Sequence, residues 1–164
     1  MNDDDGIGMD NQPESIKILI TILQTEPVPR NFEITILPNY NDFESTTKDS
    51  SIVSLEDCFM KVDTHLGIHA PTLPFLAREF RKEYYFLRRQ QRSHPEDQQQ
   101  PMQQRMLDAT QCLLLVCPDN ATAWADRRRQ MLSISSDNDL SKNMSLFENE
   151  ILFLNLLFSQ HSKA

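Results

Sequence analysis

The sequence predicts an all-α fold, built as a right-handed α–α superhelix (solenoid) of helical hairpin repeats similar to tetratricopeptide arrays. Two observations about composition support this prediction. Only three glycines occur in 164 residues, which disfavours all-β folds with many tight turns. Leu, Gln, Arg, Met and Glu, which suit helices, are well represented. A third observation is that from Met102 onward helical patterns alternate with short turns, which is the rhythm of a helical-hairpin array.

Length and charge limit the classes of protein to which the chain can belong. A chain of 164 residues with 39% apolar residues supports one soluble domain with a modest core. The net charge of −8 argues against a dedicated nucleic-acid binder. The most apolar run is far shorter than the ~20 residues of a membrane span. Three cysteines without a Cys-x-x-Cys pair, and an acidic N-terminus unlike a signal peptide, favour a cytoplasmic location.

The N-terminal part divides into an acidic tail at residues 1–14, which we expect to be disordered, and a helical lead-in region at residues 15–101. Residues 15–24 (SIKILITILQ) predict a short helix that two prolines end. Residues 32–38 (FEITILP) alternate between apolar and polar side chains and are expected to be extended. Residues 39–51 are interpreted as a loop.

A second helical region is predicted from about Ser54 onward, with Gly67 and Pro71 interrupting it. Residues 71–92 then predict a long amphipathic helix, because apolar side chains recur there at spacings of three and four. These apolar residues are Leu73, Leu76, Phe80, Tyr84 and Leu87. The basic residues of this helix lie largely off that face. Nucleic-acid binding by them is the alternative to a core helix with a solvated face, and the acidic net charge favours the core helix.

The C-terminal part, residues 102–164, predicts helical repeats, one complete and one truncated. After a polar linker at residues 93–101, helices are expected at residues 102–116, 122–134 and 140–160. CLLLVCPDNATAW and NLLFSQHSKA look like two copies of one helix end, about 44 residues apart. The last helix has a stripe formed by Met144, Phe147, Ile151, Leu154 and Phe158. Because no helix follows to cover this stripe, we expect a truncated repeat, and a Trp-x-x-Arg-Arg within about ten residues of Ala164 in a longer reading frame.

The segment CPDNATAWADRRRQML, residues 117–132, contains the only tryptophan of the chain. Pro118 cannot continue a helix, and Asp119 or Asn120 can cap the next one. Trp124 falls in the first turns of that helix, and Arg127 and Arg128 follow it at helical spacing, close enough for a guanidinium to lie against the indole. Spacing alone favours a packing anchor with solvated arginines over a basic binding face.

The same segment resembles the repeat of protein prenyltransferase alpha subunits, in which Asn-x-x-x-Trp-x-x-Arg-Arg follows a helix ending in Leu-Leu-x-x-x-Pro. The residues that carry the resemblance are Asn120, Trp124, Arg127 and Arg128, preceded by Leu114, Leu115 and Pro118. Ala121 and Ala125 stand where the family often has an aromatic residue and a histidine. These departures, together with the lead-in HLGIHAPTLPFLAREFRKEYYFLRR, are more similar to the divergent prenyltransferase alpha subunit repeat-containing proteins.

The resemblance implies a crescent of helical hairpins that wraps around a catalytic beta subunit in a heterodimer. Zinc and the prenyl diphosphate are expected in the beta subunit, so no cofactor and no metal are expected in this chain, which is not expected to catalyse alone. The implied function is to pair with the beta subunit for transfer of geranylgeranyl or farnesyl to cysteines of a protein substrate. Lys163 is a weak candidate for a lysine beside the diphosphate, and an exposed terminal lysine is the other interpretation. The alternative function is a non-enzymatic helical-repeat scaffold for protein–protein interaction.

Two other groups of residues were weighed as sites. Cys58, His65 and His69 invite a metal interpretation, but the glycine between the histidines weakens the helix that would align them and no fourth ligand is evident, so no metal site is predicted. Cys112 and Cys117 lie five residues apart around a predicted helix end and are interpreted as buried thiols rather than as a redox pair.

Overall fold

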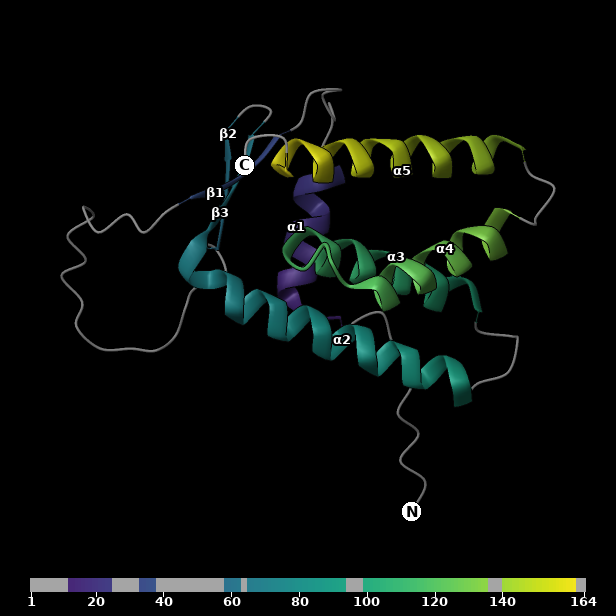
Figure 1. Cartoon of the computed structure of the whole chain (residues 1–164). Helices are drawn as coiled ribbons and strands as arrows, with labels where there is room; N and C mark the ends of the chain where they lie inside the picture. Colours follow the sequence, from purple (N-terminus) through teal and green to yellow (C-terminus); the bar gives the residue numbers. More distant parts are fainter. Residues whose placement is uncertain are drawn as a thin grey trace, which may run out of the picture.

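The computed structural model describes residues 12–24, 33–37, 58–62, 65–93, 99–135 and 140–161. These residues form five α-helices and one small three-stranded sheet (Figure 1). The helices are α1 (Glu14–Gln24), α2 (Leu73–Ser93), α3 (Gln99–Val116), α4 (Ala121–Ser135) and α5 (Leu140–His161). The strands are β1 (Glu33–Leu37), β2 (Phe59–Val62) and β3 (His65–His69), and a short 3₁₀ turn, Ala70–Thr72, leads from β3 into α2.

The described part of the chain is mostly helical, as the sequence predicts. Each of the five α-helices lies where helical spacing indicated one, with ends that differ by at most three residues from the expected bounds. The predicted extended segment is also confirmed, because β1 lies within it. The acidic tail up to residue 11, the loop at residues 39–51, and residues 94–98 of the linker lie outside the described residues.

The helical region predicted from Ser54 onward is wrong where the structure describes it. β2 and β3 form an antiparallel pair there, and β3 also pairs in parallel with β1, so the strand order is β1-β3-β2. Gly67 lies inside β3, and a Cβ atom added to it would lie 2.5 Å from Leu37 Cδ1 of β1. The mostly helical fold is thus consistent with the all-α prediction, and the small mixed sheet is the feature that the sequence did not indicate, because pairing with β1, which is distant in sequence, decides the conformation of this segment.

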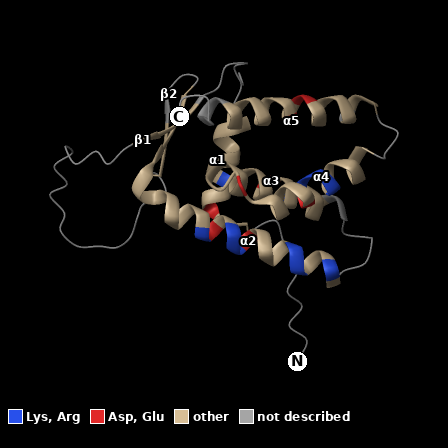
Figure 2. Ribbon diagram, in the orientation of Figure 1, with Lys and Arg blue, Asp and Glu red and all other residues tan. Residues whose placement is uncertain are grey.

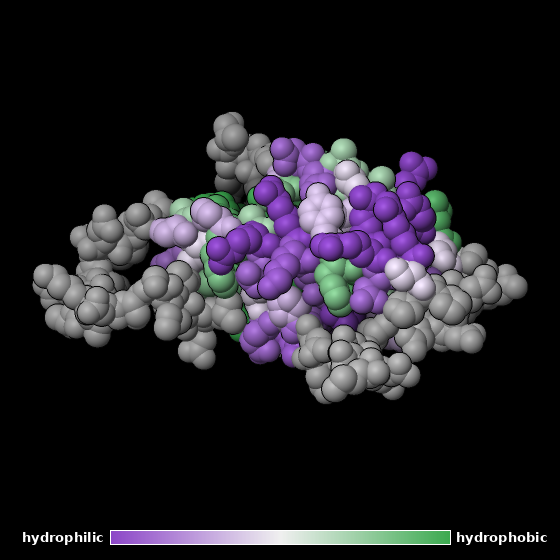
Figure 3. Space-filling view, turned by 90° about the horizontal axis from the view of Figure 1, so that it is seen from below, coloured by the Kyte–Doolittle hydropathy of each residue, from purple (hydrophilic) through white to green (hydrophobic). Residues whose placement is uncertain are grey.

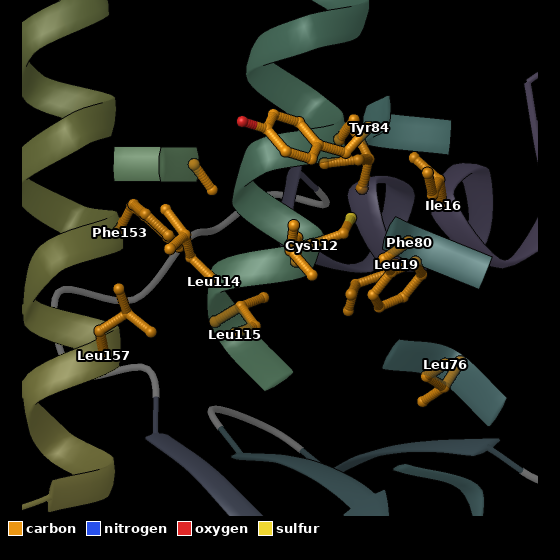
Figure 4. Close-up of a cluster of buried hydrophobic side chains, with 14 of the residues drawn as sticks. Ile16, Leu19, Leu76, Phe80, Tyr84, Cys112, Leu114, Leu115, Phe153 and Leu157 are labelled. Carbon is orange, nitrogen blue, oxygen red and sulfur yellow. The ribbon is translucent and has the colours of Figure 1, made fainter. Parts of the chain in front are cut away.

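The sheet lies at one end of the helices, next to the start of α2 and the C-terminal end of α5 (Figure 1). Helix α3 runs through the middle of the core, and its C-terminal half is buried on almost every side, whereas Pro101 and Gln104 in its N-terminal half are exposed. Ala109, Cys112, Leu113 and Leu114 of α3 have no exposed surface. Side chains from α1, α2 and α5 surround this helix, among them Leu19, Phe80 and Phe153 (Figure 4). The run of buried residues 112–115 makes this half of α3 apolar on all sides, and such a segment is stable only when other elements cover it.

The amphipathic pattern of α2 is confirmed. Leu76, Phe80, Tyr84 and Leu87 are buried, and Leu73 at the start of the helix is half-buried. Burial of each large apolar side chain stabilises the fold by about 1.5–3 kcal/mol, so this stripe alone fixes α2 against α3 and α1.

Helix α5 buries a different face from the stripe that the sequence suggested. Phe153, Leu156 and Leu157 pack into the core. The predicted stripe faces solvent instead, with exposed fractions of 62% for Met144, 47% for Phe147, 58% for Ile151 and 67% for Phe158, while Leu154 is half-buried. Four of the five side chains of this stripe are thus exposed among the described residues. None of the described helices has the length and apolar character needed to cross a membrane.

Candidate functional site

The turn between α3 and α4 begins the motif that the sequence singled out. Cys117 N still donates to Leu113 O of α3 at 2.8 Å, and the chain then turns so that Asn120 N donates to Cys117 O at 3.2 Å. Ala123 N donates to Asn120 Oδ1 at 3.0 Å, which makes Asn120 the N-cap of α4. Of the two predicted caps, the structure thus selects Asn120, and such a cap contributes about 1 kcal/mol to stability.

Trp124 fixes this turn from the other side. Its indole Nε1 donates to the carbonyl of Pro118 at 2.8 Å, so the ring closes over the turn that precedes its own helix. The indole also packs on Phe153 of α5, with ring centroids 6.1 Å apart and an interplanar angle of 39°. The interpretation of Trp124 as a packing anchor is therefore confirmed.

Arg127 is the most heavily bonded side chain of the motif. Its Nε and Nη2 bind the carboxylate of Glu150 on α5, with the shortest distance 2.6 Å from Nη2 to Oε2. Its Nη1 donates to the carbonyl of Leu107 at 2.7 Å and to Thr110 Oγ1 at 3.3 Å, both on α3. The side chain is only 6% exposed, so three helices meet at one buried guanidinium.

Two predictions about the arginines need correction. The guanidinium of Arg127 lies over the ring of Phe153, at 4.5 Å from the centroid, rather than against the indole of Trp124. Arg127 is also buried, whereas the packing interpretation left it solvated. The reason is Glu150, which is distant in sequence and draws the guanidinium toward α5. Arg128, by contrast, is exposed as predicted.

Asp126, between Trp124 and Arg127, is a site residue that the sequence analysis missed. Its buried carboxylate accepts from Tyr84 Oη of α2 at 2.6 Å and forms ion pairs with Arg88 of α2, at 2.9 Å, and Arg129, at 2.7 Å. Burial and then the hydrogen bond to Asp126 raise the pKa of Tyr84 above its usual value. An Asp directly before an arginine run is the signal that could have suggested such a pairing.

A second buried ion pair joins α2 to α3. Arg105 Nη2 lies 2.5 Å from Glu83 Oε1, and both side chains are almost fully buried. Gln130 of α4 also donates to Gln91 of α2 at 3.3 Å. Together with Asp126 and Arg127, these contacts place polar links between α4 and each of α2, α3 and α5, so the motif holds neighbouring helices in a fixed arrangement.

Comparison with known proteins adds no family to this geometry. No protein-family model matches the chain, and a search of curated proteins found no match. The resemblance to prenyltransferase alpha repeats therefore depends on the motif residues and the lead-in themselves.

The other predicted candidates lie apart from the motif. His65 and His69 are the first and last residues of β3, and Cys58 is buried just before β2. Within the ranges that the structure describes, no three His, Cys, Asp or Glu side chains are grouped so that they could hold a metal ion. Lys163 lies outside the described residues.

None of the three cysteines, all of which the structure describes, forms a disulfide. Burial raises the pKa of Cys112 well above its usual value, and the negative charge of Asp108 acts in the same direction. Cys117, at the end of α3, is half-buried and accepts from Arg81 Nη2 at 3.3 Å. The prediction of buried thiols is therefore confirmed for Cys112 and wrong for Cys117, because Cys117 lies just past the end of α3, where the core no longer covers it fully.

Proposed function

We propose that this chain is an alpha-type subunit of a protein prenyltransferase. It pairs with a catalytic beta subunit, which supplies zinc and binds the prenyl diphosphate, for transfer of geranylgeranyl or farnesyl to the cysteine of a protein substrate in the cytoplasm. The proposal includes the finer architecture, in which α3 and α4 form one helical repeat of a superhelix and α5 begins the next.

One observation carries this proposal. Asn120, Trp124 and Arg127, which bear the resemblance, act together at one helix junction: they cap α4, close the turn before it and link it to the helices on either side. Such a division of roles is what a repeat signature requires, because each repeat of a solenoid is stabilised mainly by its neighbours. The motif therefore supports a scaffold role in a complex rather than a catalytic role of its own residues.

The surface that we assign to the beta subunit is the outer face of α5. Met144, Phe147, Ile151 and Phe158 form an exposed apolar row on one side of this helix. Contiguous apolar side chains exposed on a protein surface often mark a site of contact with another protein. The row lies on the helix whose Glu150 and Phe153 hold Arg127 and Trp124, so the repeat motif fixes the position of the row.

The direct test is co-expression of the full chain with prenyltransferase beta subunits. We expect a one-to-one complex in size-exclusion chromatography with light scattering, and transfer of a labelled prenyl group to a cysteine-bearing substrate by the complex but not by either chain alone. Failure to form a complex with any prenyltransferase beta subunit contradicts the proposal.

A matched pair of variants tests the surface. Ile151→Lys places a charge in the middle of the apolar row, and Asn149→Lys adds the same charge at an exposed position of the same helix, off the row. We expect Ile151→Lys to weaken the complex at least tenfold, about 1.4 kcal/mol, because the lysine must be desolvated at the interface. Asn149→Lys should change the affinity less than twofold. Equal effects of the two variants would show that α5 does not form the contact.

A second candidate function is a non-enzymatic helical scaffold. It is favoured by the fact that Asp126 and Arg127 are fully engaged within the chain, so that the motif is explained without a catalytic partner. In this case the Ile151→Lys variant loses a partner that is not a prenyltransferase beta subunit, and no prenyl transfer accompanies the complex.

A further inference from the structure

The solvent face of α2 carries a continuous row of basic side chains with one aromatic ring at its centre. The residues of this row, which we call the basic stripe, are Arg78, Arg81, Lys82, Tyr85, Arg88, Arg89 and Arg92. They follow one another at spacings of one, three and four residues, so they share one side of the helix, opposite the buried stripe. At a rise of 1.5 Å per residue the basic stripe is about 21 Å long.

The arrangement of charge along α2 is visible in the figures. Lys and Arg follow the helix in Figure 2, and Figure 3 looks from below onto a largely hydrophilic face. Two acidic residues lie on α2: Glu83 is buried against Arg105, and Glu79 forms only a long ion pair, at 3.8 Å, with Arg78. The positive charge of the stripe is therefore largely uncompensated within the helix itself.

The C-terminal half of the basic stripe is hollowed. Tyr85, Arg88, Arg89 and Arg92 line a depression with a volume of about 310 Å³. Parts of this depression are held in place, because Arg88 is fixed by the buried carboxylate of Asp126 at 2.9 Å and the ring of Tyr85 packs on that of Tyr84 at 5.1 Å. A guanidinium that is already positioned loses less side-chain entropy when it binds an anion.

Two cations of the depression have no acidic partner among the described residues. Within the described ranges, Arg89 donates to the backbone carbonyl of Tyr85 at 3.4 Å, and neither Arg89 nor Arg92 forms an ion pair there. In a chain whose net charge is −8, such a local excess of positive charge is a marked feature. Planar guanidinium groups bind carboxylates in a bidentate manner, so two of them beside an aromatic ring suit an anionic side chain.

We propose that the basic stripe binds a short acidic peptide segment, rich in Asp and Glu, of a partner protein. An extended peptide of about six residues matches the length of the stripe, since each residue spans 3.3–3.6 Å. The net negative charge outside α2 repels a long polyanion, whereas a short acidic segment contacts only the stripe. This binding surface is separate from the outer face of α5 and does not depend on the proposed function.

The test is fluorescence anisotropy with the full chain and a dye-labelled peptide of eight alternating Asp and Glu residues. We expect this peptide to bind at least tenfold more tightly than a control peptide of eight alternating Asn and Gln residues. Its affinity should fall as salt is added, because salt screens the contacts between charges. An RNA oligonucleotide of eight nucleotides and vesicles containing an anionic phospholipid serve as competing probes. Tighter binding of either one than of the acidic peptide overturns the proposal.

Matched variants separate the basic stripe from the effect of net charge. Arg89→Glu reverses a charge in the depression, and Lys17→Glu makes the same charge change on α1, where the lysine is partly exposed and only weakly paired, at 3.7 Å, with Glu14. Arg89→Glu should weaken binding of the acidic peptide at least tenfold, and Lys17→Glu should weaken it less than twofold. Equal losses in the two variants overturn the proposal. Arg92→Gln removes a charge without adding an acid and should weaken binding of the acidic peptide by several-fold. This variant tests the same surface if Arg89→Glu lowers the stability of the fold.

Discussion

Replacement of Arg127 by methionine removes the guanidinium at the junction of α3, α4 and α5 while it keeps much of the side-chain volume. The variant leaves the carboxylate of Glu150 without its cation, although this side chain is only 15% exposed. It also removes the donors to the carbonyl of Leu107 and to Thr110, and the cation from the ring of Phe153.

The expected cost follows from these contacts. Loss of one partner from a buried ion pair typically costs about 3–5 kcal/mol, because the remaining charge stays buried and uncompensated. A domain of this size has about 5–15 kcal/mol of total stability, so Arg127→Met removes a large part of it. For a chain of this length, each kcal/mol lowers Tm by about 2–4 °C, which gives a decrease of roughly 6–20 °C.

Urea denaturation followed by far-UV circular dichroism measures this cost, with Arg128→Met as the control. Arg128 is on the same helix and exposed, so its replacement should change the free energy of unfolding by less than about 0.5 kcal/mol. A double variant, Arg127→Met with Glu150→Met, should recover part of the loss, because the second change removes the uncompensated carboxylate.

Two outcomes would refute this reasoning. If Arg127→Met and Arg128→Met cost the same within 0.5 kcal/mol, about the usual uncertainty of additive comparisons, then the buried contacts of Arg127 do not stabilise the fold. If the double variant is less stable than Arg127→Met by the full cost of a second independent change, then Glu150 acts through contacts other than its pair with Arg127.

Three further predictions follow from single positions. Native protein should react at Cys117 before Cys58 or Cys112 with a thiol reagent at mildly alkaline pH, since only Cys117 is not fully buried, and urea should make all three reactive. Burial raises the pKa of Asp108, so its contribution to stability is fully present below its unfolded pKa of about 4 and is lost as pH rises through the raised value. Asp108→Asn should remove this contribution, so the urea midpoint of wild type relative to the variant should be higher at about pH 4 than at pH 7, and an equal difference at both pH values would contradict the prediction. Gly67→Val places a Cβ atom 2.5 Å from a leucine of β1 and should cost about 1–3 kcal/mol in thermal or urea denaturation, whereas a cost below 0.5 kcal/mol would show that β1 adjusts freely.

The helices of the lead-in and repeat regions could be predicted because their determinants are local. In α2, the spacing of Leu76, Phe80, Tyr84 and Leu87 predicts which face of the helix is buried. The break before α4 likewise follows from Pro118 and from the capping ability of Asn120. In these segments the chain contains within a few residues everything that decides its conformation.

The sheet and the partners of the motif arginines could not be predicted for the opposite reason. The segment of β2 and β3 is fixed by pairing with β1, more than 20 residues earlier in the chain. The choice of Phe153 and Glu150 as partners of Arg127 depends on where α5 packs, and the sequence offered Trp124 as a nearer partner. The face that α5 buries was also ambiguous, since apolar residues occur on both sides of this helix.

The burial of the C-terminal half of α3 determines how the protein opens. Because residues 112–115 are buried in succession, the amide hydrogens around Leu113 should exchange with solvent only when the whole domain unfolds. The outer turns of α5 around Met144, which pack through one side alone, should exchange through local fraying at much lower free energy. The C-terminal half of α3 should therefore be the slowest part of the domain to exchange its amide hydrogens for deuterium.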